Sequence, residues 1–191
     1  MITLQDLKSG DVLIQCAGEP WKTGCNVFTG HPFPHAMMVS KIGVPVPDHF
    51  SGFTPNDVYV IEDGGSGVTE HLFDPVGNGW TTFPLDHFEV WRPRCDDTIK
   101  QAAITWARSR MGEGYSYGHL AIILALYRIR GSQSQPGWDD DPQYDNRKKV
   151  CSELIAMAFY RSGYDLVPLI SDSNTMPWDL RNPVTCDFIG I

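Results

Sequence analysis

The sequence predicts an α+β fold, in which an antiparallel sheet packs against helices. The first half of the chain contains short runs rich in β-branched and aromatic residues, whereas apolar residues recur at three- and four-residue spacing in the second half. Strands followed by helices favour segregated layers over a parallel sheet with alternating helices. A chain of 191 residues is long enough for one domain with a real core, so we expect a single domain over residues 1–191.

Turn residues bound each of the expected strands. The glycine-rich turn at 63–67 lies between two β-like runs and predicts a hairpin. Pro34 marks a boundary after which a strand can begin at His35. The expected strands are residues 11–15, 35–42, 58–62, 68–73, 88–92 and 186–189.

Three helices are expected in the second half of the chain. Residues 97–111 carry apolar side chains on one face and end before Gly112. Residues 118–130 are apolar almost all round, which is typical of a buried helix. Residues 151–161 have one apolar face and are closed by Gly163.

Charge and composition exclude several classes of protein. The formal net charge of -8 argues against a surface built for nucleic-acid phosphates or an anionic membrane, since both favour basic patches. The N-terminus lacks the features of a secretory signal, and the longest apolar run, 120–127, is too short to span a bilayer. We therefore expect no nucleic-acid partner, no stable membrane insertion and a cytoplasmic location. The five scattered cysteines suit reduced thiols better than a disulfide framework.

Cys151 is expected at the N-terminus of the third helix, where a polar loop ends. Unpaired backbone N–H groups and the positive end of the helix dipole stabilise a thiolate at such a position, which favours nucleophilic chemistry. The same N–H groups could hold an oxyanion. The alternative is that Cys151 is a small buried apolar residue, which is the usual role of a free cysteine.

A base and an orienting group for this thiol can be sought at the ends of the expected strands. A cysteine nucleophile needs an imidazole that shares its proton and a polar group that orients the imidazole. His35 begins one expected strand and Glu62 ends the next. If the two strands pair antiparallel, His35 and Glu62 become neighbours at one edge of the sheet.

A zinc site is a competing interpretation of the same histidine. Cys16, Cys25, His31 and His35 have the spacing C-x8-C-x5-H-x3-H, which is close to a small zinc-finger pattern. Against this hypothesis, few basic residues surround the pattern and a domain of this length needs no metal to fold. The remaining histidines are expected to be surface or structural residues: His49, His71, His87 and His119.

Several segments, taken in chain order, resemble a known group of proteins. They are Gly-Asp-Val-Leu-Ile at 10–14, His35 at the start of a methionine-rich strand, Val-Ile-Glu at 60–62 before a Gly-Val pair, and Val-Cys-Ser-Glu-Leu-Ile at 150–155. This order resembles the circularly permuted papain-like branch of the NlpC/P60 superfamily, most closely the YiiX/YaeF-like cysteine amidases. In that branch the cysteine follows the histidine, as Cys151 follows His35 here.

Two further segments are similar to the same family. Residues 112–117 resemble its glycine-tyrosine segment, and residues 175–180 resemble its late proline-aspartate-leucine motif. The chain departs from the family in a long loop at 16–34 and in an inserted acidic loop at 131–146, and we expect both near the cleft.

The resemblance implies a permuted papain-like α+β fold and a role for each matched residue. Cys151 is the expected nucleophile, His35 the base and Glu62 the orienting residue. Tyr115 is the family-matched source of an active-site hydroxyl, with Tyr117 as its substitute, although a tyrosine is more often a core aromatic.

Three functions remain open from the sequence. The first is hydrolysis of an amide bond in a peptide or acylated amine, through an acyl-enzyme and with no cofactor. The second is acyl transfer to a lipid or amine, for which Trp21, Phe28 and Phe33 could line an apolar cleft. The third is a non-catalytic binding module or a module stabilised by zinc. Neither the substrate nor the oligomeric state follows from the sequence.

Overall fold

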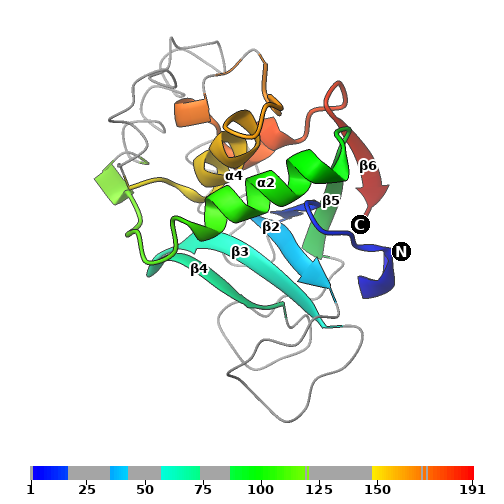
Figure 1. Cartoon of the computed structure of the whole chain (residues 1–191), viewed down its shortest axis with the longest axis horizontal. Coiled ribbons are helices and arrows are strands. Elements are labelled where there is room, and N and C mark those ends of the chain that lie inside the picture. Colours follow the sequence, from blue (N-terminus) through cyan, green and yellow to red (C-terminus); the bar gives the residue numbers. More distant parts are fainter. Residues whose placement is uncertain are drawn as a thin grey trace.

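The computed structural model describes residues 2–16, 35–42, 57–73, 87–118, 120, 148–168, 170 and 172–191. Within these ranges six strands form one antiparallel sheet, and two α-helices lie against one of its faces (Figure 1). The predicted α+β class is therefore confirmed. The assignment of residues 1–191 to one domain stays a prediction for the parts of the chain outside the described ranges.

The sheet has the strand order β4-β3-β2-β1-β5-β6, and every neighbouring pair is antiparallel. All six predicted strands are present, and the hairpin turn is tighter than expected because β3 continues to Gly64 and β4 starts at Gly67. The strands are β1 (Val12–Gln15), β2 (His35–Ile42), β3 (Val58–Gly64), β4 (Gly67–Leu72), β5 (Phe88–Pro93) and β6 (Cys186–Gly190).

Side chains of the central strands enter two separate apolar cores, one on each face of the sheet. Val12 and Ile14 of β1 pack in the core that also contains both helices, whereas Leu13 packs in the core on the opposite face. On β3, Ile61 belongs to the helix side and Val60 to the other side. Successive residues of a strand point to opposite faces. Asp63 therefore lies on the helix side, as Ile61 does, and Glu62 lies on the other side with Val60.

The helix side of the sheet is covered by α2 (Asp97–Arg108) and α4 (Cys151–Tyr160). The predicted helix 97–111 ends at Arg108, since Arg110 and Met111 donate to carbonyls three residues earlier and the chain tightens into turns before Gly112. Three short 3₁₀ turns complete the described elements: η1 (Leu4–Asp6), η4 (Asp172–Asn174) and η5 (Pro177–Leu180).

The helix that begins at Cys151 is buried on all sides, so the prediction of a single apolar face is wrong. Every residue from Cys151 to Phe159 is buried. Its two polar residues in the first turn have partners: Ser152 Oγ donates to the Thr175 carbonyl at 2.6 Å, and Glu153 accepts from the Val150 N–H at 3.0 Å. These hydrogen bonds let a helix start with polar residues inside the protein.

Several sequence predictions concern residues outside the described ranges. The expected helix 118–130 lies outside them except for residues 118 and 120, and the loops 16–34 and 131–146 lie outside them except for Cys16. Across the ranges that the structure describes, no helix has the length and apolar character needed to cross a bilayer.

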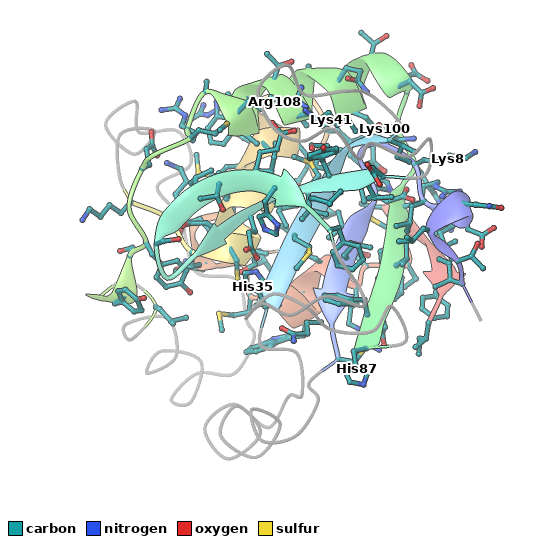
Figure 2. All side chains as sticks on the ribbon, turned by 90° about the horizontal axis from the view of Figure 1, so that it is seen from below. Lys8, His35, Lys41, His87, Lys100 and Arg108 are labelled. Atoms are coloured by element: carbon teal, nitrogen blue, oxygen red, sulfur yellow. The ribbon has the colours of Figure 1, made fainter. Side chains whose placement is uncertain are left out.

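Glu70 of β4 connects the sheet to α2. Its Oε1 accepts hydrogen bonds from Ser40 Oγ at 2.5 Å and from an Arg108 amino group at 2.6 Å, and its Oε2 accepts from Arg108 Nε at 3.0 Å. Lys41 Nζ lies 3.9 Å from the same carboxylate, and Figure 2 shows Arg108 and Lys41 on the same side of the molecule. The bidentate pair sets the position of α2 relative to β4.

Gly67 allows the segment after α2 to pack directly on the start of β4. The Val68 N–H donates to the Glu113 carbonyl at 2.8 Å, and the Gly112 N–H donates to the Val68 carbonyl at 3.0 Å. Gly67 has φ +101, and a Cβ at this position would lie 2.1 Å from the Glu113 oxygen. This contact leaves no space for any side chain at Gly67.

We predict that Gly67→Ala destabilises the protein by about 3 kcal/mol, because a left-handed backbone and a clash with main chain act together. Gly163→Ala is the matched control, since Gly163 has φ +89 and open space around its Cα. The control should cost about 1 kcal/mol. Urea unfolding of both variants measures the difference, and equal losses would contradict the importance of the contact.

Candidate active site

His35 and Glu62 meet across the pairing of β2 with β3. Antiparallel register places Met38 opposite Ile61, so the start of β2 lies beside the end of β3. His35 Nε2 forms a hydrogen bond with Glu62 Oε2, and the two side chains are 21% and 9% exposed. The structure therefore confirms the juxtaposition that strand pairing predicts. Figure 2 shows His35 at the tip of β2, where this strand begins.

Cys151, the first residue of α4, completes this group of side chains. It is a buried free thiol, 4% exposed, and it lies close enough to the His35 ring to raise the pKa of that imidazole. His35 Nε2 is engaged by Glu62. The imidazole thus lies between a thiol at a helix N-terminus and a carboxylate.

The surroundings favour a charged imidazole and a charged carboxylate. Burial acts to lower the pKa of His35, but the negative charge of Cys151, the hydrogen bonds and the charge of Glu62 outweigh it and raise this pKa well above its ordinary value. Burial acts to raise the pKa of Glu62, and hydrogen bonds from His35 and His71 lower it below its usual range. Glu62 is therefore ionised at neutral pH.

Of the two tyrosines considered from the sequence, Tyr115 is influenced by the charges of this site, whereas Tyr117 packs against the Tyr115 ring and is exposed. Burial, followed by the negative charge of Cys151 and then of Asp63, raises the pKa of Tyr115, so its hydroxyl stays protonated. Tyr117 is 62% exposed, and its hydroxyl donates to the Gly65 carbonyl at 3.2 Å in the hairpin turn. Of the two hydroxyls, that of Tyr117 is therefore engaged by the hairpin, whereas Tyr115 is within the electrostatic influence of Cys151.

Backbone hydrogen bonds bring Tyr115 to Cys151. The Ser116 N–H donates to the Lys149 carbonyl at 2.9 Å, two residues before the thiol. The Lys149 side chain is fully buried, with its Nζ 3.7 Å from Glu113 Oε2. Together with the contact at Gly67, these bonds attach the segment before Tyr115 to both the hairpin and the start of α4.

Residues 175–180, which resemble a family motif, contact the first turn of α4. Ser152 donates to the Thr175 carbonyl, and Asp179 Oδ2 accepts from the Met176 N–H at 2.9 Å. Burial raises the pKa of Asp179 to about 6. Among the contacts of the described residues, Asp179 stabilises the turn η5 and touches neither His35 nor Cys151.

His71 is a residue of this site that the sequence analysis did not select. It lies opposite Val60 in the hairpin, 29% exposed, and its Nε2 is 2.9 Å from Glu62 Oε1. The expected hairpin contained the information needed to select His71. A two-residue turn puts Thr69 opposite Glu62, and His71 then lies on the same face, diagonal to Glu62. The turn length needed for this register is not evident from the glycine-rich stretch alone.

Asp63 is a second residue that the sequence analysis missed. Its side chain is fully buried on the helix side of the sheet, and neither carboxylate oxygen has a hydrogen-bond partner among the described residues. Burial raises the pKa of Asp63 to about 7, opposed by the charges of His35 and Lys149. A buried carboxyl without partners prefers its neutral form.

The structure tests only part of the zinc hypothesis, because Cys25 and His31 lie outside the described ranges. Cys16 is half-buried, and burial followed by the charge of Glu89 raises the pKa of its thiol to about 11. No group of three or more histidine, cysteine or acidic side chains in the described part of the chain is arranged to hold a metal ion. His35 is engaged by Glu62 and Cys151 instead.

Comparisons with known proteins find a similar fold among solved structures but no match by sequence. No family model matches the sequence, and no curated protein matches it. The fold is similar to the crystal structure of the metalloprotein YiiX from Escherichia coli O157:H7 (DUF1105), with a TM-score of 0.48 and 16% sequence identity over 84% of this chain and 69% of that chain. At this level of similarity the neighbour assigns no activity to the chain.

We predict that Asp63 makes the protein less stable as pH rises from about 4 to 7. The folded state holds the Asp63 proton up to about pH 7, whereas the unfolded state releases it near the ordinary aspartate pKa of 3.8. Folding therefore becomes less favourable as pH rises between these values. Relative to wild type, Asp63→Asn should gain about 1–3 kcal/mol between these pH values. Urea unfolding at each pH measures this gain.

The control for this measurement is Asp97→Asn, because the Asp97 side chain is 95% exposed. Its stability difference from wild type should stay constant over the same pH range. A pH-independent difference for Asp63→Asn as well would show that Asp63 is ionised in the folded protein.

Proposed function

We propose that the protein is a cysteine-dependent amide hydrolase with a permuted papain-like site, in which Cys151 is the nucleophile, His35 the base and Glu62 the orienting residue. The single observation that supports this most strongly is the hydrogen bond of His35 to Glu62, with the buried Cys151 thiol close enough to act on the same imidazole. An imidazole held between a thiol and a carboxylate is the arrangement that thiol hydrolases require.

The first half of the proposed reaction forms an acyl-enzyme. The Cys151 proton resides on His35, and the thiolate sulfur attacks the carbonyl carbon of the substrate amide. The carbonyl π-electron pair moves to oxygen, where backbone N–H groups in the first turn of α4 and the Tyr115 hydroxyl donate hydrogen bonds. The C–N bond then breaks, and His35 transfers its proton to the departing amine.

The second half releases the acyl group to water. His35, now neutral, takes a proton from a water molecule that attacks the thioester carbon, and the C–S bond breaks with the electron pair returning to sulfur. The products are a carboxylic acid and the regenerated thiolate–imidazolium pair. Atoms and charges balance without a cofactor or a metal ion.

An amide of a peptide or of an acylated amine is the substrate class that fits this chemistry. The acyltransferase alternative depended on Trp21, Phe28 and Phe33, which lie outside the described ranges. Within the described residues, no contact favours a lipid acceptor or a purely binding role over hydrolysis.

We predict that Cys151 is the most reactive thiol of the protein towards iodoacetamide at neutral pH. Cys95 and Cys186 provide internal controls, because burial raises the pKa of both thiols, to about 11 for Cys186. Peptide mapping by mass spectrometry should show alkylation of Cys151 at least about 10-fold faster. His35→Ala should remove this advantage, and equal rates at the three cysteines in wild type would contradict the proposal.

We also predict a covalent intermediate on Cys151. Incubation with activated esters and with acyl-amine or peptide substrates, followed by intact-protein mass spectrometry, should reveal an added acyl mass that disappears with time. Cys151→Ala should abolish the adduct and turnover while retaining the fold. Transfer of the acyl group to an added amine in preference to water would identify a transferase instead.

A further inference from the structure

Glu62 contacts a second imidazole besides that of His35. His71 Nε2 lies 2.9 Å from Glu62 Oε1, while His35 Nε2 bonds the other oxygen, Oε2. On its far side, His71 Nδ1 lies 3.1 Å from the Leu72 carbonyl oxygen. The Glu62 carboxylate therefore bridges two histidines. His35 comes from β2 and His71 from β4, the two strands on either side of β3.

The number of protons on His71 follows from its two partners. The Leu72 carbonyl can only accept a hydrogen bond, so Nδ1 carries a proton. An ionised Glu62 can only accept as well, so Nε2 also carries a proton. Both ring nitrogens thus donate, which makes His71 an imidazolium. In agreement, the hydrogen bond to Glu62 is the main cause that raises the pKa of His71, against the effect of burial.

We propose that His71, as an imidazolium, is a positioning residue that holds the second oxygen of Glu62 and limits how strongly this carboxylate retains the proton of His35. The inference rests on the proposed function, because it assigns His71 to the same site. His71 acts through Glu62 and makes no contact with the nucleophile in the described structure.

The electrostatic reason lies in the leaving-group step of the first half-reaction. His35 must release its proton to the departing amine, and a buried carboxylate that faced a single imidazolium would oppose this release. His71 places a second positive charge on the same carboxylate, and the two imidazoliums repel each other. The charged or titratable groups that act on His71 are Glu62 of β3 and His35 of β2, while Asp63 points to the opposite face of the sheet.

The test is an NMR titration of the histidine Cε1–H signals in wild type, His71→Gln and His71→Ala, with no need for a substrate. His71→Gln keeps an N–H donor for Glu62 but removes the charge, so His35 should titrate about 0.5–1 pH unit higher than in wild type. His87→Gln is the matched control, because His87 adjoins β5, which is separated from β3 by β1 and β2. It should leave the His35 titration unchanged.

Kinetics give the second readout. The alkaline limb of kcat/KM should move to higher pH in His71→Gln by the same interval as the His35 titration. His71→Ala, which also loses the donor to Glu62, should lower kcat by about 10-fold with little change in KM, and His71→Gln should restore part of this loss.

The outcomes separate this inference from the proposed function. If wild type is inactive on all amides but His35 still responds to His71→Gln, the coupling stands and the hydrolase proposal fails. If wild type is active and the His35 titration is the same in His71→Gln, or if His71 titrates below 6.5 in wild type, the inference on His71 is wrong and the hydrolase proposal is unaffected.

Discussion

The hydrogen bond between His35 and Glu62 depends on the antiparallel pairing of β2 with β3, and the rest of the site is arranged around it. A one-residue slip in this register would turn Glu62 to the helix side of the sheet and away from His35. The buried helix α4 brings Cys151 close enough to His35 to act on the pKa of its imidazole. Strand register and helix docking thus determine whether the thiol has a base.

Burial of so many charged groups at one end of a sheet requires internal compensation. Glu62 can be ionised beneath the surface because two imidazoles donate to it. On the opposite face of the same strand, Asp63 has no donor among the described residues, and burial raises its pKa. Two adjacent carboxyls of similar chemistry therefore have pKa values shifted in opposite directions, because strand alternation places them in different environments.

Local patterns in the sequence predicted the six strands, α2 and the start of α4, since spacing of apolar residues and turn residues act over a few positions. They also predicted that His35 and Glu62 meet. The burial of α4 on all sides was not predicted, because Ser152 and Glu153 look solvent-facing until their partners at Thr175 and Val150 are known. Thr175 comes from a segment more than twenty residues away, so only the tertiary structure supplies the partner of Ser152.

The sequence by itself determined the α+β class, the position of Cys151 at a helix start and the neighbouring strands that carry His35 and Glu62, because each depends on short-range pattern and pairing. Only the tertiary structure decided that the segment of Tyr115 is hydrogen-bonded to the residues before Cys151 and that His71 holds the second oxygen of Glu62. Both results depend on long-range packing and on a hairpin register that a shift of one residue would reverse.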